Sequence, residues 1–123
     1  MKRKFLFEWY SSPAGKRLKQ SEMEFLRRSI TVGCKQTIVQ IGCLGWENQF
    51  IDCSLYQQFM VIDLDGLAWG NVAEIKAKSH ELPLQTESVD MVIMPHSLEF
   101  DEERHQTLRE VSRILKPEGK LII

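Results

Sequence analysis

The stretch that decides the fold is residues 88–123, SVDMVIMPHSLEFDEERHQTLREVSRILKPEGKLII. It begins with the apolar run Val89 to Met94, which is typical of a buried strand, and continues through a polar loop into an amphipathic helix. Pro117-Glu118-Gly119 then predicts a turn, and Lys120 to Ile123 begins a last strand. This order of strand, helix and strand predicts a βαβ unit with parallel strands.

The helix inside this unit has two further signals. We expect Asp101-Glu102-Glu103 to lie in its first turn, where the helix dipole favours acidic side chains. Leu108, Val111 and Leu115 recur at helical spacing, which predicts that they form the buried face.

The same alternation of strands and helices continues upstream. Thr37 to Ile41 and Phe59 to Leu64 predict buried strands, and Val72 to Lys76 alternates as an exposed edge strand does. Trp46 to Leu55 can form a short helix, whereas Asp65 to Asn71 is too short for a regular crossover helix. The pattern therefore predicts a doubly wound, mostly parallel α/β sheet with its ligand site beyond the carboxyl ends of the strands.

An amphipathic helix precedes this sheet. Ser11-Ser12-Pro13 predicts its start, because a hydroxyl can cap the helix and proline is tolerated at the first position. Thr31-Val32-Gly33 is expected to end it. The apolar face should consist of residues at helical spacing, which are Leu18, Phe25, Leu26 and Ile30.

The bulk composition predicts a single domain, 1–123, with an N-terminal helical segment at 1–33 and a core at 37–123. The formal net charge of −1 gives no indication of a nucleic-acid partner, and no apolar run is long enough for a membrane helix. The three cysteines are an odd number without metal-ligand spacing, so we expect no metal site and free thiols in a reducing compartment. Together these features predict a cytoplasmic protein.

A glycine-containing turn follows the first strand, in the sequence Ile38-Val39-Gln40-Ile41-Gly42-Cys43-Leu44-Gly45. With this turn, the stretch from Leu82-Pro83 to Asp90 and the ending LKPEGKLII, the chain resembles the class I S-adenosylmethionine-dependent methyltransferases, in particular the small-molecule type 11 group. The resemblance covers about residues 37 to 123. It implies a Rossmann-like core in the strand order 3-2-1-4-5 with a weak third strand, and a chain that stops before the family's last two strands.

The resemblance also implies S-adenosylmethionine as cofactor. Gly42 matches the first glycine of the family's turn, acid-x-Gly-x-Gly-x-Gly, which holds the methionine part, and Cys43 and Gly45 complete the turn here. Asp63 ends the second strand about 20 residues later, where an acid can bind a ribose. A tight turn and an exposed strand-end acid are the alternatives.

Several residues depart from the family pattern. Gln40 stands where the family has an acid, and Leu44 and Trp46 stand where it has glycines. Lys78 replaces an acid that binds the adenine amino group, and a lysine cannot accept that hydrogen bond. Adenine recognition would then depend on the backbone of Ser79 and His80, or has been lost.

His96 follows the fourth expected strand, where the substrate faces the methyl group in the family. A histidine there could act as general base for a hydroxyl or amine, or could be a surface loop residue. Glu8-Trp9-Tyr10 precedes the first helix, and we expect it to pack on that helix as a hydrophobic staple.

Three functions are compatible with the sequence. The first is a methyltransferase acting on a small molecule. The second is a degenerate or truncated relative with weak or absent cofactor binding, and the third is a non-enzymatic interaction module. A homodimer through the apolar edge near Leu121, Ile122 and Ile123 is also expected.

Overall fold

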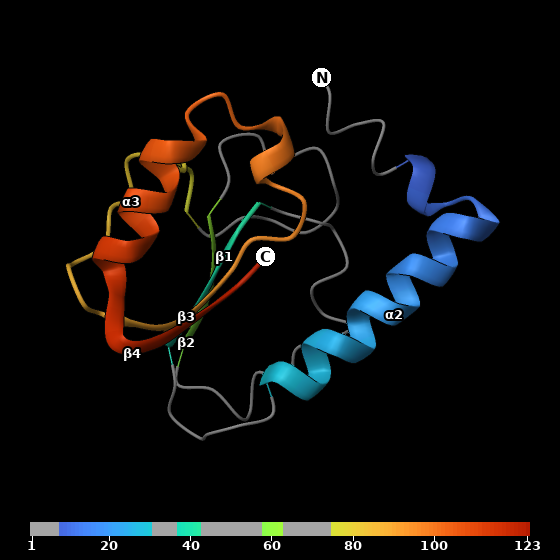
Figure 1. Cartoon of the computed structure of the whole chain (residues 1–123), viewed down its shortest axis with the longest axis horizontal. Helices are drawn as coiled ribbons and strands as arrows, with labels where there is room; N and C mark the ends of the chain where they lie inside the picture. The colour runs from blue at the N-terminus through green and yellow to red at the C-terminus, as the bar shows by residue number, and fades with distance from the viewer. Residues whose placement is uncertain (1–7, 31–36, 43–57, 63–74) are drawn as a thin grey trace.

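The computed structural model of the chain describes residues 8–30, 37–42, 58–62 and 75–123 (Figure 1). These ranges contain a parallel sheet of four strands in the order β2-β1-β3-β4. The strands are β1 (Thr37–Ile41), β2 (Gln58–Ile62), β3 (Val89–Ile93) and β4 (Leu115–Ile122). This order agrees with four of the five positions that the sequence predicts for a doubly wound sheet.

The fifth position belongs to the predicted edge strand Val72 to Lys76. In the described residues it is reduced to one isolated parallel bridge between Ile75 and Ile62, in which the Ile75 N–H donates to the Val61 carbonyl at 3.2 Å. The bridge lies beside β2, so the neighbour is the one expected. The rest of that segment up to residue 74, the short crossover at 65–71 and the predicted helix at 46–55 lie outside the described residues.

Among the described residues, one helix covers each face of the sheet, α2 (Pro13–Ile30) on one side and α3 (Arg104–Ile114) on the other (Figure 1). The core accordingly has two parts. The part beside α2 contains Tyr10, Met23, Leu26, Ile38, Met91 and Ile93. The part beside α3 contains Val39, Ile41, Met60, Ile62, Leu82, Val89, Val92, Met94, Val111 and Ile114. Within the described ranges, neither helix has the length and apolar character that crossing a membrane requires.

The start of α2 is confirmed, but its predicted apolar face is only partly right. The Ser12 hydroxyl accepts the Gly15 N–H at 3.1 Å, and Pro13 is the first helical residue. Of the predicted face, Leu26 is buried, whereas the side chains of Leu18 and Phe25 are 38% and 53% exposed.

Close packing at Gly15 explains this difference. Gly15 is buried against the turn before the helix, and a Cβ there would lie 2.0 Å from the Trp9 carbonyl oxygen. The buried side of α2 contains Gly15, Met23 and Leu26, with the half-buried Glu22 beside them, and it leaves Leu18 and Phe25 outside.

The helix α3 also differs in detail from the sequence prediction. It begins at Arg104, so Asp101, Glu102 and Glu103 precede it and do not occupy its first turn. Asp101 instead accepts the Glu103 N–H at 2.8 Å, a local bond that competes with the helix. The buried face of α3 consists of Thr107, Val111 and Ile114, while the predicted Leu108 and Leu115 are only partly buried.

The predicted turn Pro117-Glu118-Gly119 is a bulge within β4. Leu115 pairs with Val89 and Lys120 with Met91, so four residues of β4 loop out between two registered pairs. Proline has no N–H for the ladder, which explains why the segment leaves it. A Cβ on Gly119 would lie 2.9 Å from the Lys116 carbonyl oxygen, so this bulge needs a glycine.

Candidate functional site

The carboxyl ends of β1, β3 and β4 lie side by side and position the candidate site. Gln40 pairs with Ile93, so Gly42, which follows β1, lies level with Pro95, which follows β3. The Met94 N–H donates to the Ile122 carbonyl at 2.8 Å and fixes the end of β4 beside β3. A ligand site at this edge is what a parallel sheet of this order predicts.

Gly42 is the part of the predicted ligand turn that the structure describes. Gly42 has a φ of 92°, which a residue with a side chain rarely adopts, and its N–H donates to the Ile62 carbonyl at 2.9 Å. The fully buried Gln40 donates from its amide to the Gly42 carbonyl at 2.9 Å. Gly42 therefore has the open backbone conformation that a cofactor turn would use, and its N–H is already bonded inside the sheet.

Of the other residues predicted to bind the cofactor, the structure describes only Ser79 and His80. Cys43, Gly45 and Asp63 lie outside the described residues, so their placement stays a prediction. Ser79 and His80 lie together in a turn, within which the Glu81 N–H donates to the Lys78 carbonyl at 3.1 Å.

The Ser79 side chain is already engaged in hydrogen bonds within the protein. Its hydroxyl donates to Asp101 at 3.2 Å and lies 3.3 Å from the Thr107 hydroxyl. Thr107 itself is fully buried and donates to the same Asp101 carboxylate at 2.5 Å. The backbone of Ser79 and His80 therefore remains the part that could meet a ligand.

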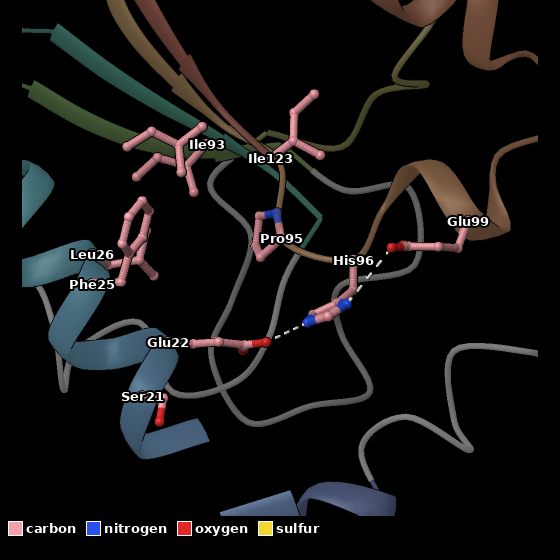
Figure 2. A pocket seen from close by; sticks show the side chains of 10 residues that line it. Ser21, Glu22, Phe25, Leu26, Ile93, Pro95, His96, Glu99 and Ile123 are labelled. Carbon is pink, nitrogen blue, oxygen red and sulfur yellow. Dashed lines mark hydrogen bonds and ion pairs between the residues drawn. The ribbon is translucent and has the colours of Figure 1, made fainter. Parts of the chain in front are cut away.

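A pocket of about 340 Å³ opens between α2 and the ends of β3 and β4 (Figure 2). Its apolar lining consists of Phe25, Leu26, Ile93, Pro95, Ile122 and Ile123. Its polar lining consists of Ser21, Glu22, His96 and Glu99. The volume is in the usual range for small-molecule sites, and so is the combination of an apolar wall with a few polar groups.

His96 is held in this pocket by contacts from two directions. Its Nε2 lies 2.6 Å from Oε1 of Glu22 on α2, and its Nδ1 lies 3.8 Å from Oε1 of Glu99 (Figure 2). The other oxygen of Glu22 accepts the Tyr10 hydroxyl at 2.7 Å. His96 has a φ of 52°, an uncommon backbone conformation that aims the ring into the pocket.

The Glu22 carboxylate influences the protonation of both His96 and Tyr10. The hydrogen bond to Glu22 raises the pKa of His96 above its ordinary value, against the opposing effect of burial. Burial, followed by the Glu22 carboxylate, raises the pKa of Tyr10, which keeps the phenol protonated. A carboxylate can only accept, so Nε2 of His96 carries the proton toward Glu22 in the neutral ring as well.

This arrangement is able to accept a proton from a ligand. With Nε2 donating to Glu22, the neutral ring of His96 presents the lone pair of Nδ1. A proton gained at Nδ1 would face the Glu99 carboxylate while Nε2 faces Glu22, so a carboxylate on each side of the ring stabilises the imidazolium. A base oriented by a carboxylate on its second nitrogen is the usual arrangement of a histidine general base.

The sequence analysis identified His96 but not its partners. Glu22 sits within the charged surface that an amphipathic helix normally shows, and Tyr10 precedes that helix. Tyr10 is buried at 6% exposure and packs against α2, as the expected staple does. The available signal was the helical spacing of Gly15, Glu22 and Leu26, which places one carboxylate on the face turned toward the sheet.

Comparison with known proteins shows which family and which fold the chain resembles. A sequence profile described as "Methyltransferase domain" matches residues 39–123. The uncharacterized protein YafS of Escherichia coli K12 is 28% identical over 115 residues, which cover 94% of this chain and 46% of that protein.

Two solved structures illustrate the fold. An S-adenosylmethionine-dependent methyltransferase from Mesorhizobium loti superposes with a TM-score of 0.61 at 24% identity, over 78% of this chain and 49% of that one. The [4+2]-cyclase SpnF superposes with a TM-score of 0.71 at 19% identity, over 88% of this chain and 44% of that one. The chain thus spans about half the length of each of these three proteins.

Proposed function

We propose that the chain, which belongs to the methyltransferase domain family, binds S-adenosylmethionine and transfers its methyl group to a small molecule. The observation that carries this proposal is the pocket at the carboxyl ends of β3 and β4, with His96 held in it by Glu22. The cofactor, when bound, supplies a methyl group on a positively charged sulfur. The methyl acceptor would occupy the pocket.

Gly42 and Asp63 are the residues that we assign to the cofactor. The Gly42 turn would lie under the methionine part, because its backbone has no Cβ to obstruct a ligand. The Asp63 carboxylate would accept hydrogen bonds from the ribose, as acids at the ends of such strands do. The turn at Ser79 and His80 would border the adenine through its backbone.

The pocket residues would position the acceptor and receive its proton. The apolar wall, which includes Leu26 and Ile93, would exclude water from the reacting atoms. His96 would take the acceptor's proton at Nδ1 while Glu22 holds the ring from the other side. Methyl transfer depends strongly on alignment, and the close packing of α2 on the sheet supplies a fixed wall for it.

A second function is favoured by one observation at the turn. The Gln40 amide, where the family has an acid, is used to hold the Gly42 carbonyl. Together with Leu44, Trp46 and Lys78, this difference favours a relative that keeps the fold and has lost cofactor binding. The SpnF cyclase also indicates that one fold carries more than one kind of reaction.

An activity assay tests the proposal. Transfer of a labelled methyl group from S-adenosylmethionine to a set of small amines and phenols should be detectable with the parent chain. His96→Asn should lower the rate by about 100-fold, the usual contribution of a general base. His105→Asn, at an exposed position of α3, is the matched control and should leave the rate unchanged. Absence of transfer to every acceptor would contradict the proposal.

A further inference from the structure

The pocket between α2 and the ends of β3 and β4 has an uneven charge. Its ionisable lining consists of two glutamates, Glu22 and Glu99, and one histidine, His96. No lysine or arginine is present among the described residues that line it. With His96 protonated the lining therefore carries a net negative charge, and with His96 neutral the charge is more negative still.

The charged and apolar parts of the pocket are separated. Figure 2 shows Glu22, His96 and Glu99 in one row, with Phe25, Leu26 and Ile93 grouped toward its Glu22 end and Pro95 next to His96. Glu22 already has two hydrogen bonds, to His96 and to Tyr10. Glu99 has one long contact at 3.8 Å and a side chain that is 60% exposed, so it can still bind a charged ligand group.

From this arrangement we infer that the pocket selects a small organic ammonium, with its nitrogen beside His96 and Glu99 and its apolar body along Pro95 toward Ile93. Carboxylates and phosphates should bind more weakly, since both glutamates would repel them and the protonated form of His96 is already paired with Glu22. A ligand of this shape places its polar end at the row and its carbon surface on the apolar wall.

The inference deepens the proposed function and rests on it where the reaction is concerned. The ammonium would lose one proton to Nδ1 of His96 and become a neutral amine. The nitrogen lone pair would form a bond to the methyl carbon of the sulfonium donor, and the carbon–sulfur bond would break with its electron pair remaining on sulfur. The product is a methylated ammonium, and the proton on His96 passes to water.

Three probes of nearly equal shape test the selection, namely benzylamine, benzyl alcohol and benzoate. Binding to the full chain is followed through the methyl resonances of Ile93, Ile122 and Ile123, which line the pocket. Benzylamine, as its ammonium, should bind most tightly and benzoate most weakly. Glu99→Gln should lower the affinity for benzylamine by about threefold to fivefold, the scale of a partly exposed ion pair, and should raise that for benzoate.

A control variant and a parallel titration separate the possible outcomes. Glu118→Gln removes an exposed acid from the bulge of β4, outside the pocket, and should leave all three affinities unchanged. Benzoate binding as tightly as benzylamine, an unaltered ranking in Glu99→Gln, or no shift with any probe would overturn the inference. S-adenosylhomocysteine is titrated into the same sample. If S-adenosylhomocysteine binds but the pocket does not prefer benzylamine, only this inference fails. If the pocket prefers benzylamine but S-adenosylhomocysteine does not bind, only the proposed function is contradicted.

Discussion

Replacing Glu22 with glutamine should destabilise the chain in a manner that depends on pH. Glu22 joins α2 to the loop after β3, because one carboxylate oxygen lies 2.6 Å from His96 and the other accepts the Tyr10 hydroxyl at 2.7 Å. Glutamine has nearly the same size and keeps one oxygen that can accept from Tyr10. The substitution therefore removes the negative charge facing His96 and leaves the packing in place.

The size of the effect follows from the contacts that are lost. A hydrogen bond to a charged group contributes about 1.5–3 kcal/mol to stability. The side chains of His96 and Glu22 are 29% and 23% exposed, which places this bond at the lower end of that range. We expect Glu22→Gln to lower the free energy of unfolding by about 1.5 kcal/mol when His96 is protonated.

The pH dependence follows from the raised pKa of His96, whose main cause is the hydrogen bond to Glu22. A histidine whose pKa is raised by folding adds stability that is fully present below its ordinary pKa of 6.5 and is lost as pH rises through the folded value. The cost of the substitution should therefore be largest near pH 5.5 and fall to about 0.5 kcal/mol near pH 9. Tyr10 stays neutral throughout, since its pKa is raised above the ordinary 10.0.

Urea unfolding at these two pH values measures the effect. Glu24→Gln is the matched control, because it removes the same charge from the same helix at an exposed position, and it should change stability by less than about 0.5 kcal/mol. Equal costs for the two variants at acidic pH, or a cost of Glu22→Gln that grows with pH, would refute the reasoning.

Three other predictions concern the fold around the site. Gly15→Ala should lower the free energy of unfolding by about 1–3 kcal/mol in a thermal melt, because its Cβ would overlap the Trp9 carbonyl; a stabilised variant would show that the turn moves freely. Gln40→Glu should destabilise the chain by about 2 kcal/mol, since a buried carboxylate cannot donate to the Gly42 carbonyl, and an unchanged melting temperature would contradict that role. We also expect a dimer through the edge of β4, so Leu121→Lys should favour the monomer in light scattering across a dilution series, whereas a parent chain that is already monomeric at high micromolar concentration would exclude it.

The parts of the fold that were predictable from the sequence are those with a simple pattern of apolar residues. Ile38 to Ile41 and Val89 to Ile93 are nearly continuous apolar runs, and they form the central strands β1 and β3. The cap at Ser12 was also predictable, because its signal is local. Order and direction of the strands follow from such elements once the crossovers are right-handed.

The errors arise where tertiary contacts change the local pattern. Phe25 counts as apolar in any periodicity, yet it lies beside the pocket and is 53% exposed. Thr107 counts as polar, yet it is fully buried because its hydroxyl is bonded to Asp101. The pairing of Glu22 with His96 joins residues 74 positions apart, and no local pattern reports such a contact.

The central claim is that the turn at Gly42 belongs to a working cofactor site, and calorimetry with S-adenosylhomocysteine tests it most directly. We expect saturable binding of one molecule per chain, and Asp63→Ala should weaken that binding by about 1.5–3 kcal/mol, the scale of hydrogen bonds to a charged group. Absence of saturable binding by the parent chain would contradict the claim and favour a relative that has lost its cofactor.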